Sequence, residues 1–256
     1  MKAHQNGENG GGARFGSTCW SVVLSAAQNQ EPAGQAALAE LYRIYWYPLY
    51  CYVRRRGHTS EDAEDLTQGF FVHLLEHRAL AQVDPRRGKF RSFLLASLQN
   101  FLSVAYEREH AIKRGRLCAF IPLDATTAES RFQLESVDEL TAEQIFDARW
   151  ALTLLEEAMK SVRQQYSRRG KQEIFEVLKT FLRPEGGEAV GSYHRAAMAL
   201  GVSDAAIKTW IHRLRRQYSL ALRREVARTV LEPAAIDDEI RVLCAALVAA
   251  EGRLPL

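Results

Sequence analysis

Apolar residues recur every three or four positions along most of the chain, which is the spacing that puts them on one face of an α-helix. The clearest stripe lies between residues 203 and 222 and consists of Ile207, Ile211, Leu214, Tyr218 and Leu222. No segment of the sequence shows the strict alternation that marks a half-buried strand. The pattern therefore predicts an all-α protein.

The segment just before this stripe predicts a tight turn between two helices. Residues 192–216 read SYHRAAMALGVSDAAIKTWIHRLRR. The small side chains of Ala196 and Ala197 let two helices cross closely. Gly201 can adopt a positive φ in the turn, and Ser203 can cap the second helix. This pattern is typical of a helix-turn-helix, whose second helix usually lies in the DNA major groove.

The polar side of the second helix is the predicted DNA-contacting surface. Its alternative is an ordinary basic helix exposed to solvent, which is the usual fate of a charge run. Arg and Lys can donate to phosphates or to guanine, and Thr or Ala can touch a thymine methyl group. We expect DNA contacts from Ser203, Ala205, Lys208, Thr209, His212, Arg213 and Arg216.

Composition and breaks in the pattern predict two helical domains joined by a linker, the second containing the helix-turn-helix. Pro122 and a run of threonines and carboxylates mark the linker. The expected divisions are a disordered tail at 1–16, a helical domain at 17–115, a linker at 116–140, the second domain at 141–230 and a C-terminal helical extension at 231–256.

The net charge of +3 is small, but the basic residues are clustered along the chain. Such clustering suits a protein that meets DNA with only some of its faces. The four cysteines form no CxxC pair, so we expect reduced thiols in a cytoplasmic protein. The N-terminus does not read as a signal peptide, and no apolar run is long enough to cross a membrane.

Two helical segments of the first domain carry family motifs. EDAEDLTQGFFVHLL, which begins at Glu61, resembles the pattern DAEDLxQExFxxxx of the extracytoplasmic-function (ECF) sigma factors of bacterial RNA polymerase. FRSFLLASLQNFLSVAYERE, which begins at Phe90, is similar to the segment FRxWLxxIAxNxxxDxxR of that family. Together they resemble sigma region 2, and residues 150–224 resemble sigma region 4.

The resemblance implies a non-enzymatic transcription initiation factor with no catalytic residue, cofactor or metal. Its implied partners are core RNA polymerase and promoter DNA, and the family allows an anti-sigma factor. Core polymerase would be met by Asp65, Gln68, Phe71 and Leu75. The −10 element would be met by Asn100, Tyr106, Arg108, Lys113 and Arg114, and the −35 element by the seven residues of the second helix of the helix-turn-helix.

The chain departs from the family pattern at three positions. Gly69 stands where Glu is usual, Phe93 replaces Trp, and Val104 falls where Asp is common. Phe93 and Phe101 recur at helical spacing, so we expect them to be core residues rather than DNA contacts.

Two rival functions remain open from the sequence. The first is an autonomous helix-turn-helix regulator that binds its operator without a polymerase. The second is a zinc site at His73-Leu74-Leu75-Glu76-His77, which fits the HxxEH pattern of inverted zinc proteases. No downstream carboxylate ligand and no protease-sized domain support the zinc site, so an amphipathic helix that carries two histidines is the favoured explanation of the match.

Overall fold

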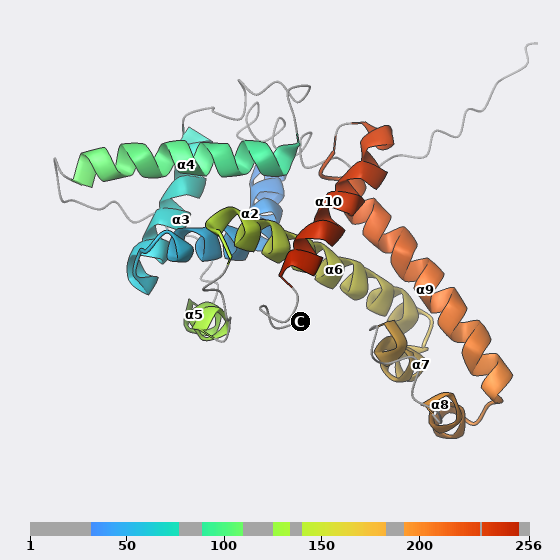
Figure 1. Cartoon of the computed structure of the whole chain (residues 1–256). Coiled ribbons are helices and arrows are strands. Elements are labelled where there is room, and N and C mark those ends of the chain that lie inside the picture. Colours follow the sequence, from blue (N-terminus) through green and yellow to red (C-terminus); the bar gives the residue numbers. More distant parts are fainter. Residues whose placement is uncertain are drawn as a thin grey trace, which may run out of the picture.

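The computed structural model describes residues 32–76, 89–109, 125–133, 140–182, 192–230 and 232–250, and every regular element in these ranges is helical (Figure 1). The α-helices are α2 (Pro32–Arg55), α3 (Ser60–Glu76), α4 (Phe90–Glu109), α5 (Ala125–Gln133), α6 (Ala142–Arg168), α7 (Gln172–Leu178), α8 (Ser192–Leu200), α9 (Asp204–Ala227) and α10 (Ile236–Ala249). The 3-10 helix η2 (Lys179–Leu182) follows α7, and the 3-10 helix η4 (Pro233–Ala235) precedes α10. The predicted all-helical composition is thus confirmed over the described ranges, and the predicted tail at 1–16 lies outside them.

Helix α6 is the central element of the molecule. A capping box fixes its start, because the Thr141 hydroxyl accepts a hydrogen bond from the Gln144 backbone N–H at 3.2 Å. The Gln144 side chain in turn accepts from the Thr141 backbone N–H at 2.9 Å. From this start α6 runs past α2 and α10 at one end and past α7 and α9 at the other (Figure 1).

The first hydrophobic core joins α2, α3, α4 and α10 to the N-terminal half of α6. The ring centroid of Tyr45 lies 3.9 Å from that of Trp150 on α6 and 5.2 Å from that of Phe90 on α4. All three side chains are almost completely buried. Helices from the first predicted domain therefore pack directly against the helix that opens the second.

The second core is built from the C-terminal half of α6 together with α7, η2, α8 and α9. Ala158 and Val162 on α6 are fully buried in it, as is Ile207 on α9. Since α6 contributes to both cores, the predicted boundary at residue 141 falls at the start of a shared helix. The division into two domains stays a prediction.

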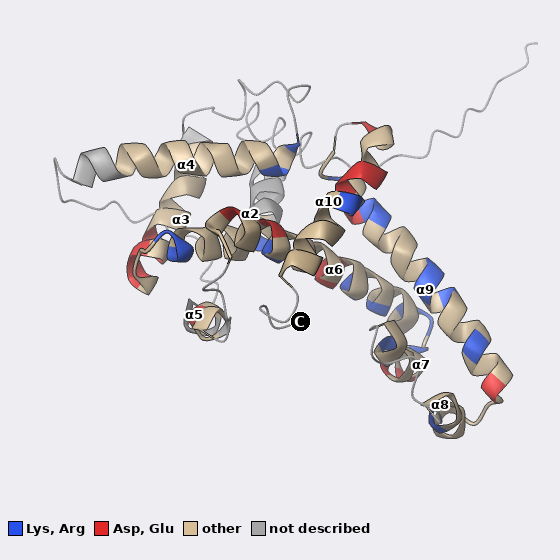
Figure 2. Cartoon of the chain, in the orientation of Figure 1, with Lys and Arg blue, Asp and Glu red and all other residues tan. Residues whose placement is uncertain are grey.

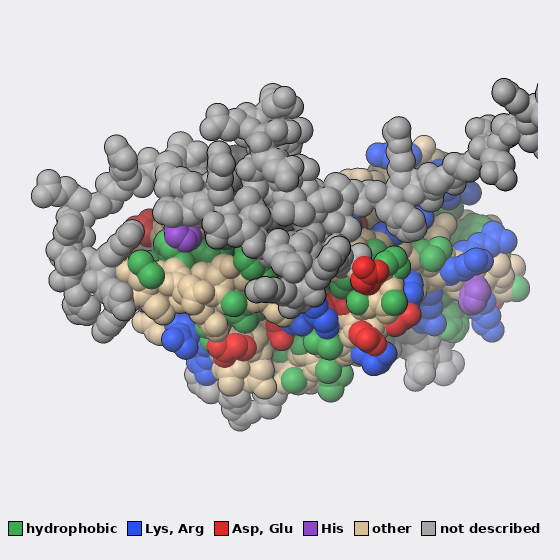
Figure 3. Space-filling view, turned by 90° about the horizontal axis from the view of Figure 1, so that it is seen from above, with side chains coloured by type: hydrophobic (Ala, Val, Ile, Leu, Met, Phe, Trp, Pro, Cys, Tyr) green, Lys and Arg blue, Asp and Glu red, His purple; other side chains and the backbone are tan. Residues whose placement is uncertain are grey.

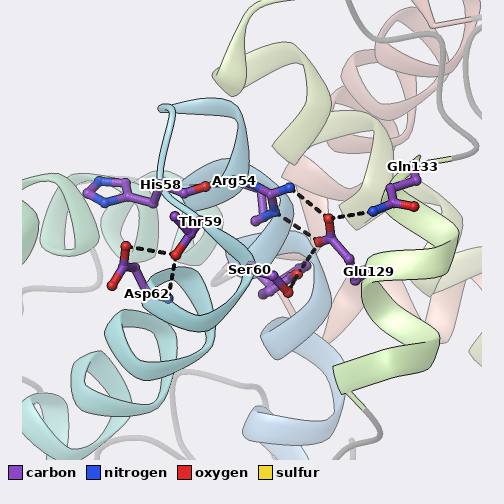
Figure 4. Close-up of polar contacts among 8 residues, drawn as sticks. Arg54, His58, Thr59, Ser60, Asp62, Glu129 and Gln133 are labelled. Carbon is purple, nitrogen blue, oxygen red and sulfur yellow. Dashed lines mark hydrogen bonds and ion pairs between the residues drawn. The ribbon is translucent and has the colours of Figure 1, made fainter.

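Helix α5, within the predicted linker, is attached to α2 by a network of hydrogen bonds (Figure 4). Arg54 donates to both carboxylate oxygens of Glu129, at 2.9 and 2.7 Å, and the Tyr50 hydroxyl donates to Glu129 at 2.5 Å. Chiefly because of Arg54, the pKa of Glu129 falls to about 2. The attachment of this linker helix to α2 does not follow from the sequence pattern.

No helix among the described residues is both long and apolar enough to span a membrane.

Candidate nucleic-acid and partner interfaces

The turn between α8 and α9 has the geometry that the sequence predicts. Gly201 has a φ of 64°, in the left-handed region that favours glycine. The backbone N–H of Val202 donates to the Ala197 carbonyl at 3.0 Å, and that of Gly201 donates to Met198 at 3.4 Å. These two bonds form a Schellman motif, which ends α8 and redirects the chain.

Helix α9 begins directly after this turn with its own cap. The Ser203 hydroxyl accepts a hydrogen bond from the Ala206 backbone N–H at 3.3 Å. This bond satisfies one of the amide groups that lack a partner at a helix start. Ala196 and Ala197 on α8 are buried, as the close crossing of two helices requires. The end of α8 and the start of α9 are therefore fixed by local bonds.

The two faces of α9 separate as the apolar pattern predicts. Ile207, Ile211 and Leu214 are buried in the second core, and Tyr218 and Leu222 are half-buried beside it. The seven residues predicted to contact the −35 element are all exposed: Ser203, Ala205, Lys208, Thr209, His212, Arg213 and Arg216. Each of the six from Ala205 onward lies three or four residues from another member of the set, so the six share one side of the helix.

The cations on this side of α9 are available to an outside ligand. Lys208 lies over the ring of Tyr193, 5.7 Å from its centroid, and no ion pair joins Lys208, Arg213 or Arg216 to a carboxylate within the described ranges. Arg215 points elsewhere, because its guanidinium donates to the Phe181 carbonyl at 3.0 and 3.3 Å. Figure 3 shows Lys, Arg and a histidine gathered at the end of the molecule that α9 forms.

The predicted polymerase-contacting residues on α3 differ in exposure. Asp65 is exposed, and Gln68, one turn later, is half-buried with its amide donating to Glu64 at 3.1 Å. Phe71 is only 4% exposed, and its ring packs against Tyr42 with centroids 4.9 Å apart. The structure thus places Phe71 behind the surface that Asp65 and Gln68 form. The side chain of Leu75 lies outside the described part.

The predicted −10 residues are described only in part. Asn100 on α4 is exposed. Tyr106 and Arg108 belong to the same helix, but their side chains lie outside the description, and Lys113 and Arg114 lie outside it altogether. The structure therefore brings Asn100 to the surface and does not place the other four side chains.

The aromatic residues of α4 pack beside one of the departures from the family pattern, Gly69. Phe93 and Phe101 are half-buried and pack against the first core, as expected from their spacing. Phe101 lies 5.8 Å from Phe70, measured between ring centroids. A Cβ placed at Gly69 would meet the Phe101 ring at 3.4 Å, which is ordinary van der Waals contact. Gly69 thus lies beside the Phe101 ring, and nothing in the structure requires a glycine at this position.

The zinc alternative cannot be assembled from the described residues. The His73 ring lies 5.4 Å from that of Phe101, whereas the Glu76 side chain and His77 lie outside the described part. Within that part, no group of three or more His, Cys, Asp or Glu side chains comes together to hold a metal ion.

A charge cluster at the start of α4 was missed by sequence reasoning. Lys89 and Arg91 meet Glu239 of α10, and Arg91 also pairs with Asp147 of α6. Burial raises the pKa of Asp147, and the Arg91 charge opposes this rise. The three carboxylates that open α10 are visible in the sequence, but their partners are far away along the chain.

Comparison with known families gives a match for the N-terminal helices. Residues 41–109 match the family model of Sigma-70 region 2, and this matched segment covers α3, α4 and most of α2. Neither the curated proteins nor the solved structures give a match to this chain. The predicted resemblance of this segment to sigma region 2 is therefore confirmed. It supports a sigma-70 family factor with a role in RNA polymerase binding and promoter melting, and members of this family are initiation factors rather than enzymes.

Proposed function

We propose that this protein is a sigma factor of the ECF type, which binds core RNA polymerase and recognises −10 and −35 promoter elements to start transcription. The observation that carries the proposal is the exposed polar side of α9, which follows a capped turn in a chain whose residues 41–109 match Sigma-70 region 2. In this proposal α2–α4 act as region 2, and α7–α9 with the end of α6 act as region 4.

The chemistry of α9 suits recognition of duplex DNA. Arg213 and Arg216 can donate to phosphates or to the acceptors of guanine, and the methyl groups of Ala205 and Thr209 can meet a thymine methyl. These groups are exposed and share one side of the helix. The Schellman motif and the Ser203 cap hold the start of α9 rigidly, which favours reading of base edges.

The proposed polymerase contact is the exposed side of α3. Asp65 and Gln68 stand at the family positions that dock on the coiled-coil clamp helices of the largest polymerase subunit, according to the resemblance. Asp65 is exposed and has no ion-pair partner among the described cations. An exposed carboxylate beside an amide offers both acceptors and donors to a polar partner helix. Phe71 supports this surface from the core.

The −10 contact is proposed for the end of α4 and the basic run after it. Asn100 is exposed on α4 and stands at the Asn of the family pattern. Melted bases need aromatic and basic groups to hold them, which the sequence supplies at Tyr106, Arg108, Lys113 and Arg114.

A pull-down of purified bacterial core RNA polymerase tests the proposal. The wild-type chain should bind saturably, and the double variant Asp65→Ala/Gln68→Ala should lose this binding. Glu61→Ala on the same helix is the matched control. Glu61 is exposed and lies one turn before Asp65, so this variant removes the same charge from a neighbouring position. If the double variant binds as well as the control, the docking surface is wrong. Failure of the wild type to bind, with tight binding of the protein alone to duplex DNA, would favour an autonomous regulator.

A further inference from the structure

A small cavity opens beside α9, between that helix and the turn that joins α6 to α7. Its volume is about 160 Å³, below the roughly 300–1,000 Å³ of ordinary small-molecule pockets, so it suits one compact group. Trp210 and Gln217 line it from α9 together with Arg213, and the spacing of three and four residues puts all three on one side of the helix. The residues that line it from α6 and the following turn are Tyr166, Arg169 and Lys171.

The turn between α6 and α7 holds two cations at this cavity. The backbone N–H of Lys171 donates to the Tyr166 carbonyl at 2.9 Å, and that of Gly170 donates to the Ser167 carbonyl at 2.9 Å. Gly170 has a φ of 66°, in the left-handed region that favours glycine. These bonds form a second Schellman motif, like the one that ends α8. Arg169 and Lys171 are therefore carried by a turn that local bonds fix.

The described lining of the cavity contains three cations and no carboxylate. Arg169, Lys171 and Arg213 are exposed, and no ion pair joins any of them to an acidic side chain in the described ranges. Burial raises the pKa of Tyr166, and the charges of Arg169 and Arg213 oppose this rise, so both guanidinium groups lie near the same hydroxyl. Cations gathered without a counter-charge repel one another, and an anion that enters the cavity relieves this repulsion.

We propose that this cavity is a phosphate-binding site in which Arg169, Lys171 and Arg213 hold one phosphate group. Arg and Lys make charge-assisted hydrogen bonds with phosphate oxygens, and the Gln217 amide can add a neutral donor. The Trp210 ring supplies an apolar wall for the group that carries the phosphate. The phosphate can belong to a DNA strand or to a free phosphorylated molecule, because the chemistry is the same. The site itself goes beyond the sigma function and does not depend on it.

Arg213 joins the cavity to the proposed DNA surface, because it belongs to both. Figure 2 shows basic residues along α9 and on the turn between α6 and α7 beside it. A DNA strand can place a backbone phosphate in the cavity while α9 lies in the groove. A free phosphorylated molecule would instead engage Arg213 and weaken DNA binding. These two consequences rest on the proposed function in assigning α9 to DNA.

Titration of the full-length chain with sodium phosphate at constant ionic strength, followed by tryptophan fluorescence, tests the site. The wild-type chain should give a saturable change that Trp210→Phe removes, since Trp210 lines the cavity. Arg169→Ala and Lys171→Ala should each weaken phosphate binding by about tenfold. Arg168→Ala is the matched control and should bind like the wild type. Arg168 is exposed and adjacent to Arg169, but it does not line the cavity.

A labelled mixed-sequence DNA duplex separates the two sources of phosphate. If a backbone phosphate occupies the cavity, Arg169→Ala and Lys171→Ala should each lower the slope of log K against log salt by about one, and Arg168→Ala should leave it unchanged. If the slope is the same in all variants, or the chain alone binds no duplex, saturable binding of sodium phosphate assigns the site to a free phosphorylated molecule.

Two results would overturn the proposal. Equal effects of Arg168→Ala and Arg169→Ala in both titrations would show that binding reflects general charge. The absence of a saturable response to phosphate, together with a salt slope that no variant changes, would show that the cavity holds no phosphate. Loss of the polymerase pull-down with phosphate binding intact would reject the sigma function and keep the site, and the opposite result would do the reverse.

Discussion

The exposed polar side of α9 and the start of α4 both carry basic residues, but these residues differ in burial and in their ion pairs. On α9, Lys208, Arg213 and Arg216 are exposed and have no carboxylate partner in the described ranges. At the start of α4, Arg91 is buried between Asp147 and Glu239. A basic cluster in a sequence therefore does not by itself mark a DNA-binding surface. Burial and the position of carboxylates decide whether a cation stabilises the fold or meets a ligand.

The largest expected effect comes from removing the buried cation. Arg91→Ala leaves Asp147 and Glu239 without their shared partner, so it should lower the free energy of unfolding by about 3–5 kcal/mol. Urea unfolding followed by circular dichroism measures this change. The comparison variant is Arg213→Ala, which removes an exposed cation and should change stability by less than about 0.5 kcal/mol. Equal losses of stability in the two variants would contradict the distinction between Arg91, which is buried and paired with carboxylates, and Arg213, which is exposed.

The exposed cation should instead matter for DNA. Arg213→Ala should weaken binding to an upstream promoter element by about 1–3 kcal/mol and relax specificity at one base pair, if Arg213 reads a base. A uniform loss over all sequences would assign Arg213 to a phosphate. Arg215→Ala is the control of the same residue type, because Arg215 is bound to the Phe181 carbonyl and should affect folding more than sequence preference. Binding of the holoenzyme to a set of single-base promoter variants measures the affinity and the sequence preference of both variants.

The Glu129 carboxylate is paired with Arg54, and its contribution to stability depends on pH. Its pKa in the folded chain is about 2, below the usual value of about 4.5 for a glutamate, so ionisation stabilises the fold above pH 4.5. This contribution should be lost as the pH falls from about 5 towards 2, and it should amount to roughly 1–2 kcal/mol after allowance for solvent screening. Glu129→Gln should show a weaker dependence over this range in urea unfolding. An unchanged slope would mean that the Arg54 contact contributes nothing to stability.

The smallest expected effect concerns the start of α9. Ser203→Ala removes the oxygen that accepts from the Ala206 N–H, so it should cost about 1 kcal/mol of stability. Ser203→Asp restores an acceptor and should recover most of the loss. Thermal unfolding compares the three chains. Equal midpoints for wild type and Ser203→Ala would show that the cap is not needed to hold α9.

Local features of this fold could be read from the sequence, because they depend on neighbouring residues. The buried stripe at Ile207, Ile211 and Leu214 follows from helical spacing, and the conformation of Gly201 and the cap at Ser203 follow from turn chemistry. The exposed position of Asp65 follows in the same way. These features needed no knowledge of how the helices pack.

Features that depend on packing between distant segments could not be predicted. The sequence does not show that α6 belongs to two cores, or that Glu239 lies beside Lys89 and Arg91. Nor does it show that Gly69 lies beside the ring of Phe101 from another helix. Each of these contacts joins residues from separate helices, which periodicity and capping rules do not address.

The most direct test of the central claim is transcription from total DNA of the source organism by core polymerase with and without this protein. The account predicts that the protein adds defined transcription start sites that share upstream elements, and that Arg213→Ala changes the preferred −35 sequence. If the protein adds no start sites while it binds duplex DNA tightly on its own, the sigma function proposed for this chain is contradicted.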